Sequence, residues 1–272
     1  TLFPTATQTF DVLRVPTRTP DSPAQCPAEN SALVPSFEFH FKLCLEVGTQ
    51  VLDFLNAGGQ PQRIVDEMHL VPQFDLTDDG ILELILPGCN FQVYSCKDGQ
   101  YQTILDIDNQ GANIHTLAIE DMNLDGVPDL IIGGRESPFG NISTILYRIL
   151  EWDGQQFKNL VSHPDFRSRY GGGGISDGWI FSDGVGQEGS DIWKNLKLLD
   201  IDGNGTIELV LKSGLYTFWD GQINGGPVRA ETFTYMWNGN EFNLESIEVD
   251  APQYRYQAVQ DAELDIPVLE VE

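Results

Sequence analysis

The chain has 272 residues and is strongly acidic, with 41 Asp and Glu against 15 Lys and Arg and a formal net charge of −26. Because 41% of the residues are hydrophobic, a folded chain with a substantial core is expected. The negative charge argues against nucleic acids and anionic lipids as partners, since their phosphates would be repelled. No apolar run reaches the roughly 18 residues that a membrane helix needs, so no membrane span is expected.

The opening segment, residues 1–30, is rich in Thr, Pro and Ser, which is typical of an extended tether or leader. We expect it to link a folded part to an export signal or a cell-surface anchor; a cloning remnant is the alternative. The four cysteines form no CxxC pair and suit two disulfides in an oxidising, extracellular compartment. Of the three possible connectivities we favour Cys89–Cys96 with Cys26–Cys44, and buried free thiols are the alternative.

The segment 31–70 is predicted to contain one strand and two short helices. Residues 37–47 alternate apolar with other residues, which favours a half-buried strand. The apolar residues of 49–68 are spaced for two helices interrupted at the sequence AGGQP. From 71 to 250, short β-branched, aliphatic and aromatic runs alternate with Gly, Asn and Asp, which predicts successive short strands. The acidic segment 251–272 is expected to end as an edge strand or a frayed end.

One acidic pattern occurs three times in the strand-rich part, as DLTDDGILELILPG from Asp75, DMNLDGVPDLIIGG from Asp121 and DIDGNGTIELVLKS from Asp200. Each copy runs into an apolar stretch and is followed by an aromatic segment that contains an Asp-Gly or Asn-Gly pair, the usual signature of a tight hairpin turn. The predicted repeating unit is therefore an acidic loop, a strand, a connection, a strand, a turn and a strand.

Residues 162–193 lengthen the interval between the second and third copies and include four consecutive glycines. We predict a long insertion loop there. Loops of that length without regular structure are usually functional or disordered. Its aromatic residues are candidates for contacting a partner. They are Tyr170, Trp179, Phe181 and Trp193.

The acidic loops carry oxygen-bearing side chains at positions 1, 3, 5 and 9, counted from the first aspartate, and glycine at position 6. Oxygen ligands at alternating positions of a tight loop suit a hard cation, and Ca²⁺ fits best. A bound cation would also neutralise carboxylates that otherwise repel one another beside a buried strand. The predicted metal ligands are Asp75, Thr77, Asp79 and Glu83 in the first loop, Asp121, Asn123, Asp125 and Asp129 in the second, and Asp200, Asp202, Asn204 and Glu208 in the third.

Two other interpretations of the loops fit the sequence less well. An EF-hand needs a Glu at position 12 between two helices, whereas Leu86, Ile132 and Leu211 stand there and the flanks are typical of strands, so the EF-hand is rejected. Plain Asp- and Gly-rich hairpin turns would explain one copy, but three copies that share an acid at position 9 favour metal binding.

The three loops resemble the calcium loops of FG-GAP and VCBS repeats, the blade units of integrin-alpha-like β-propellers. The resemblance covers roughly residues 70–245 and is specific at the loops. It implies four-stranded antiparallel blades, with Ca²⁺ held between neighbouring strands by the ligands named above. Integrin-like propellers contain more blades than the loops seen here. The expected fold is therefore mainly β, with antiparallel blade-like repeats of a small or incomplete propeller and a short N-terminal helical segment.

The expected function is that of a secreted or cell-surface module with structural Ca²⁺ at two or three sites, which binds an extracellular protein or glycan in adhesion. Catalysis is not expected, because the sequence shows no HExxH, GxSxG or P-loop motif. A secreted hydrolase on a propeller scaffold is one alternative, with His163 and Asp165 as the first residues to test. A subunit of a larger surface assembly is another.

Overall fold

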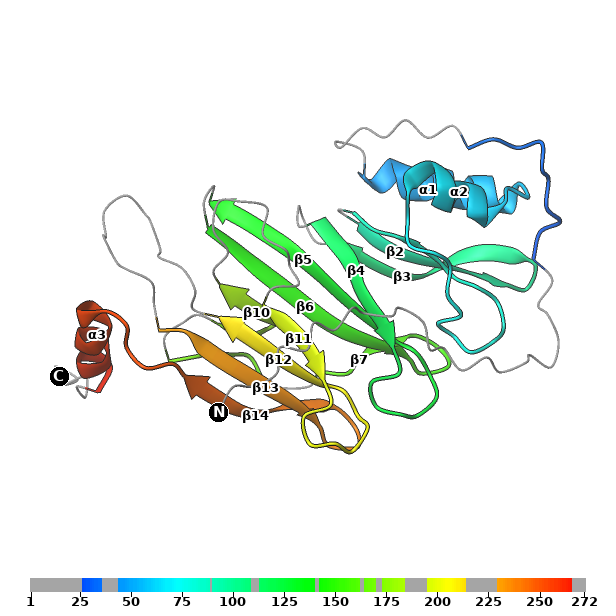
Figure 1. The fold of residues 1–272 in the computed structure, drawn as a ribbon. Helices are drawn as coiled ribbons and strands as arrows, with labels where there is room; N and C mark the ends of the chain where they lie inside the picture. Colours follow the sequence, from blue (N-terminus) through cyan, green and yellow to red (C-terminus); the bar gives the residue numbers. More distant parts are fainter. Residues whose placement is uncertain are drawn as a thin grey trace, which may run out of the picture.

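The computed structural model describes residues 26–35, 44–88, 90–108, 113–139, 142–161, 164–169, 173–183, 195–213 and 229–265. Within these ranges the chain forms three antiparallel sheets and three short helices (Figure 1). This confirms the mainly β fold and the short N-terminal helical segment. The described sheets do not close into a barrel or a propeller ring. No helix in these ranges has the length and apolar character needed to cross a membrane.

The three sheets are built from strands that mostly pair in chain order. The first contains β1 (Leu84–Leu86), β2 (Asn90–Lys97) and β3 (Gln100–Asp108). The second has the order β4 (Asn113–Glu120), β5 (Asp129–Phe139), β6 (Ile142–Trp152), β10 (Trp179–Asp183), β9 (Gly173–Ser176) and β8 (Phe166–Arg167), with β7 (Phe157–Asn159) also paired to β6. The third contains β11 (Leu196–Leu199), β12 (Glu208–Ser213), β13 (Glu231–Trp237) and β14 (Phe242–Val249).

The second and third sheets contain the same unit, with the same order of strands and turns and equivalent side-chain contacts. An acidic loop joins β4 to β5 and β11 to β12, and β6 and β13 each lead through a tight turn into the next strand. In both turns the first side chain, Asp153 or Asn238, accepts hydrogen bonds from two following backbone N–H groups. A cross-strand aromatic pair closes each turn, with ring centroids 5.4 Å apart for Trp152–Phe157 and 5.1 Å apart for Trp237–Phe242. The strand order therefore matches the predicted repeating unit.

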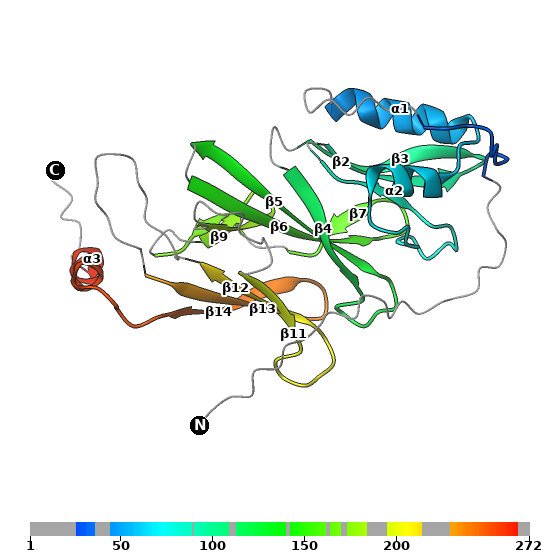
Figure 2. The same cartoon turned by 45° about the horizontal axis from the view of Figure 1, so that its top comes forward.

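Two helices, α1 (Cys44–Asn56) and α2 (Pro61–Met68), cover one face of the first sheet (Figure 2). Val47, Val51 and Leu55 of α1 recur every four residues, are buried, and pack with Tyr94 of β2. The strand predicted at 37–47 is therefore wrong for residues 44–47, because this helical spacing overrides the short alternating run. The rest of that range lies outside the described residues.

The segment predicted as an insertion loop adds strands to the second sheet instead. Asp177 and Gly178 turn β9 back onto β10, and β10 pairs with β6. Glycine is needed in β9, since a Cβ on Gly174 would lie 2.1 Å from the carbonyl oxygen of Phe166. Trp179 and Phe181 are only 8% and 7% exposed, so they belong to the interior rather than to a partner-binding surface. Tyr170 and Trp193 lie outside the described residues.

Apolar contacts join the sheets into a continuous series. One cluster combines residues of the first and second sheets, including Phe91 and Ile132, and another combines the second and third, including Tyr147 and Phe233. A backbone hydrogen bond also joins the second and third sheets, because the N–H of Phe242 in β14 donates to the carbonyl of Leu160, just after β7, at 2.7 Å. At the end of the series, α3 (Arg255–Asp265) follows β14, so the C-terminal prediction of an edge strand or frayed end is wrong for residues 261–265.

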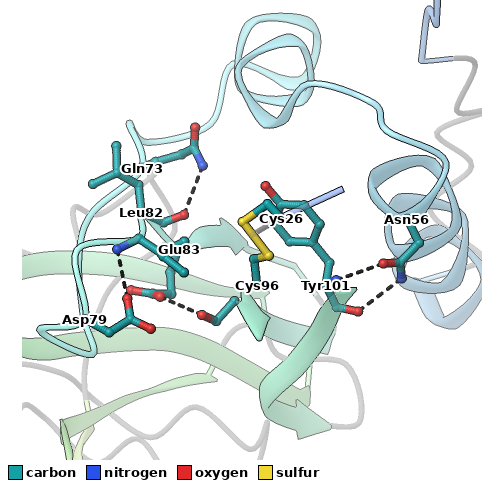
Figure 3. The surroundings of a disulfide bond; sticks show 10 residues. Cys26, Asn56, Gln73, Asp79, Leu82, Glu83, Cys96 and Tyr101 are labelled. Atoms are coloured by element: carbon teal, nitrogen blue, oxygen red, sulfur yellow. Dashed lines mark hydrogen bonds between the residues drawn. A yellow bond between two sulfur atoms is a disulfide. The ribbon is translucent and has the colours of Figure 1, made fainter. Parts of the chain in front are cut away.

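The disulfide joins Cys26 to Cys96, with the two Cα atoms 5.7 Å apart (Figure 3). Both favoured pairings, Cys89–Cys96 and Cys26–Cys44, are therefore wrong. Since Cys26 and Cys96 are bonded to each other, neither can pair with a third cysteine. The bond ties the start of the described chain to the first sheet. Cys89 lies outside the described residues.

Candidate metal sites

The three acidic loops, named loop 1 (75–82), loop 2 (121–128) and loop 3 (200–207), have the same closure. In each, the residue before position 1 pairs with the acid at position 9; the pairs are Phe74 with Glu83, Glu120 with Asp129, and Leu199 with Glu208. Positions 4 and 6 have positive φ in every copy; these residues are Asp78, Leu124 and Gly203, then Gly80, Gly126 and Gly205. Two left-handed residues reverse the chain so that the position-9 acid starts the next pairing.

Side chains at positions 1 and 5 turn inward onto the backbone of their own loop. The position-1 aspartate accepts a hydrogen bond from the glycine N–H at position 6, at 2.9 Å in loop 1, 3.0 Å in loop 2 and 3.1 Å in loop 3. The position-5 side chain accepts one from the N–H at position 7, at 2.8, 2.8 and 2.6 Å. Each carboxylate oxygen has two lone-pair directions, so these bonds leave acceptor capacity inside the loop.

The acid at position 9 is fully buried in all three copies, with 0% of Glu83, Asp129 and Glu208 exposed. Each accepts a hydrogen bond from the N–H at position 2, at 2.6, 2.8 and 2.7 Å respectively. Burial, followed by the negative charges nearby, raises the pKa of Glu83 to about 8 and that of Asp129 to about 8. A carboxyl group in such surroundings favours either a proton or a cation.

Loop 3 brings its predicted ligands together most closely. Among the described residues, Asp200, Asp202 and Glu208 form the acidic group whose donor oxygens lie within 4.8 Å of one another. The fourth predicted ligand, Asn204, donates to Asp202 at 3.0 Å and accepts from the Thr206 N–H at 2.6 Å. Within the part of the chain that the structure describes, loop 3 therefore forms an acidic cluster that could hold a metal ion.

Loop 2 has a buried oxygen that lacks a partner. Oδ2 of Asp129 accepts the Met122 N–H, whereas Oδ1 is buried and has no hydrogen-bond partner among the described residues. A buried acceptor without a partner is costly, which favours a ligand at this atom. The loop also gains Glu151 from β6, whose Oε2 accepts a 2.6 Å hydrogen bond from Nδ2 of Asn123. Sequence reasoning missed Glu151, because it lies in a later strand outside the nine-residue pattern.

Loop 1 satisfies its buried acid with hydroxyl groups. Ser95 on β2 donates to Oε1 of Glu83 at 2.8 Å, and Thr77 donates to the same atom at 3.3 Å. Asp79 and Glu83 lie near the disulfide (Figure 3). Thr77 therefore faces Glu83, and this carboxylate already has protein partners.

The loops follow one another along one edge of the molecule (Figures 1 and 2). Loops 2 and 3 are in contact, since the Ile207 N–H donates to the Met122 carbonyl at 2.8 Å. A Cβ placed on Gly205 would lie 3.1 Å from Cδ1 of Leu124. A change at either loop is thus adjacent to the other.

Compared with known protein families, curated proteins and solved structures, the chain shows no match. What the loops do must therefore follow from their own chemistry. Of the two residues named for a hydrolase, Asp165 is exposed and accepts the Asp177 N–H at 3.0 Å. His163 lies outside the described residues.

Proposed function

We propose that this chain is a secreted, calcium-binding β-repeat module of the FG-GAP/VCBS type, in which Ca²⁺ at the acidic loops stabilises the ends of the sheets. The observation that carries the proposal is the position-9 carboxylate, which is fully buried in three loops of identical closure. Oxygen ligands in a flexible loop suit Ca²⁺ better than Mg²⁺, which demands a smaller octahedral site. The Cys26–Cys96 disulfide supports an oxidising, extracellular location.

The proposed role of Ca²⁺ is structural. Each position-9 acid begins the pairing of a strand whose next residues, such as Leu84, Leu130 and Leu209, are fully buried. A cation at the loop offsets the repulsion between carboxylates and allows that strand to start beside them. Because an ion held this way binds the folded protein much better than the unfolded chain, it stabilises the fold by mass action.

Calorimetric titration of Ca²⁺ into metal-stripped protein, with thermal melts alongside, tests this function. We expect two or three sites and a higher melting temperature in Ca²⁺ than in chelator, with a smaller effect of Mg²⁺ at equal concentration. Matched sodium chloride controls for simple screening of the acidic surface. Absence of binding, or melting curves that coincide with and without metal, would reduce the loops to hairpin turns.

A glycan is the partner that the surface next to loop 1 favours. A cavity of about 620 Å³ lies between loop 1, the β2–β3 turn and the β6–β7 turn, a volume in the range of small-ligand sites. Its lining combines the ring of Trp152 with Asp79, Asp98 and Gln102. An aromatic ring can stack on the apolar face of a sugar, while carboxylates and amides can bind its hydroxyl groups.

Trp152 and Trp237 offer a matched pair of variants for this partner. They occupy equivalent places in two units, but Trp152 lines the cavity whereas Trp237 does not. We expect Trp152→Ala to abolish binding to any glycan that the wild type retains on a glycan array, and Trp237→Ala to leave that binding intact. Equal loss in both variants would indicate a general effect on folding, and no loss in Trp152→Ala would exclude this cavity.

A further inference from the structure

The predicted ligand positions give the three loops equal charge. Each has three carboxylates among its four predicted ligands; they are Asp75, Asp79 and Glu83, then Asp121, Asp125 and Asp129, then Asp200, Asp202 and Glu208. Since calcium affinity in such loops depends on the number of charged ligands, this pattern alone predicts three similar sites. A difference between the sites must therefore come from residues outside the loops.

In each unit, the strand that pairs with the segment after the position-9 acid places a different residue opposite that acid. Leu84 pairs with Tyr94, Leu130 with Leu150, and Leu209 with Tyr235. One step further along each antiparallel ladder, the residues opposite the acid are Ser95, Glu151 and Met236. Loop 2 therefore faces a carboxylate where loop 1 faces a hydroxyl and loop 3 a thioether.

Glu151 is in direct contact with the ligand set of loop 2. Its Oε2 accepts the 2.6 Å hydrogen bond from Nδ2 of Asn123, which leaves Oδ1 of Asn123 directed at the loop, where it accepts the Asp125 N–H at 3.0 Å. Across the ladder lies Asp129, with the buried Oδ1 that has no partner among the described residues. Directly opposed residues of antiparallel strands have Cβ atoms about 5 Å apart, so the register of β5 with β6 brings the two carboxylates close. A divalent cation between them would satisfy both.

We propose that Glu151 supplies a fourth carboxylate to the metal site of loop 2 and makes it the tightest of the three calcium sites. This inference rests on the proposed calcium-binding function and adds a residue from a neighbouring strand to the loop ligands. Four negative charges attract a divalent ion more strongly than three, and the opposed Asp129 and Glu151 repel each other until the ion is bound.

The glycines at position 6 provide one reporter for each loop. The N–H groups of Gly80, Gly126 and Gly205 donate to the position-1 aspartate of their own loops. A Ca²⁺ titration of metal-stripped protein, followed by the amide NMR signals of these glycines, therefore gives an affinity for each site. We expect the Gly126 signal of the wild type to respond at the lowest Ca²⁺ concentration.

Glu151→Gln tests the charge separately from the packing. Glutamine keeps the length of the side chain and an oxygen that can accept from Asn123, but it removes the charge. We expect the Ca²⁺ affinity reported by Gly126 to fall about tenfold or more, since losing a partner beside a metal site costs at least that much. The affinity reported by Gly205 should be unchanged. An unchanged Gly126 affinity would overturn the inference. No response at any of the three glycines would instead overturn the proposed calcium-binding function.

Met236→Glu makes the converse test at loop 3. It places a carboxylate opposite Glu208, at the place that Glu151 holds opposite Asp129. We expect the affinity reported by Gly205 to rise about tenfold and the Gly126 value to stay the same. This gain keeps the inference testable even if Glu151→Gln fails to fold, and a Gly205 affinity that does not rise would count against a carboxylate at this place as a ligand.

Discussion

Replacing Asp129 by Asn separates the two roles of the position-9 acid. Asparagine keeps the size of the side chain and an oxygen that can accept the Met122 N–H, but it has no charge. In the metal-free protein the charge is unfavourable, because Asp129 is 0% exposed and burial raises its pKa to about 8. In the Ca²⁺-bound protein the same charge is the proposed ligand. We therefore expect Asp129→Asn to stabilise the metal-free protein at alkaline pH and to remove the stabilisation by Ca²⁺ at loop 2.

The size of the effect follows from the shift between the ordinary pKa of 3.8 and the folded value of about 8. Between these values the unfolded chain has released the proton that the metal-free folded protein retains. The free energy of unfolding therefore falls as pH rises, by about 1.4 kcal/mol for each pH unit. Below this window both states hold the proton, and above it both have released it. The full window sets an upper bound of roughly 6 kcal/mol, and we expect a few kcal/mol because water can enter the loop.

Urea unfolding in chelator and in Ca²⁺, at about pH 5.5 and about pH 8, measures these differences. In chelator, the stability of Asp129→Asn relative to wild type should increase with pH. In Ca²⁺ at a hundredfold excess over the dissociation constant, the wild type should gain about 2.7 kcal/mol at this site, and the variant should not. Asp153→Asn is the matched control, since Asn238 stands at the same place in the third unit. A metal-free variant less stable than wild type at pH 8 would refute the buried-charge reasoning.

Three further changes test other parts of the fold. Replacing Cys26 and Cys96 by Ser opens a connection between residues 70 apart and should lower the free energy of unfolding by about 4 kcal/mol under non-reducing conditions, while wild type in reductant should match the variant. Gly126→Ala puts a Cβ on a residue with φ of 93° and should lower the free energy of unfolding by about 1–2 kcal/mol. Gly154→Ala, with φ of 94° in a turn, should lower it as much without changing the Ca²⁺ affinity. Equal Ca²⁺ affinities in the two variants would count against a metal at loop 2. Arg229→Met removes the hydrogen bonds that this buried side chain makes to Asp261 of α3 and to the Asp250 carbonyl. It should destabilise the protein by about 3 kcal/mol and speed amide exchange in α3. Unchanged exchange would show that α3 is held by other contacts.

The features that could be predicted from the sequence are local ones. Each acidic loop closes within nine residues, so its alternating oxygens, its glycine and its position-9 acid stand next to one another in the chain. The hairpin turns at Asp153 and Asn238 are local for the same reason, and both form as predicted. The turn at Asp177 and Gly178 has the same Asp-Gly pair and joins β9 to β10. The four glycines just before it favour a loop, so the sequence predicted a loop there instead of a hairpin.

The features that could not be predicted depend on contacts between distant parts of the chain. The partner of Cys96 comes from the opening segment, and the two cysteines are 70 residues apart. Residues 44–47 alternate like a strand, and the helical spacing of Val47 and Val51 prevails because it buries one face of α1 against β1 and β2. Glu151 becomes part of loop 2 through the register of β5 with β6, and no spacing within a single segment indicates that pairing.

The surroundings of the position-9 acid also rank the loops by their dependence on metal. Glu83 in loop 1 has two hydroxyl donors and a backbone N–H, so both of its oxygens have partners without an ion. Asp129 in loop 2 has one backbone N–H, a buried oxygen with no partner among the described residues, and Glu151 nearby. Metal removal should therefore loosen the pairing of β4 with β5 before that of β1 with β2. Amide hydrogen exchange would show this as faster exchange at Leu130 than at Leu84 in chelator, and the reverse order would show that burial of the acid, rather than its missing partners, sets the dependence.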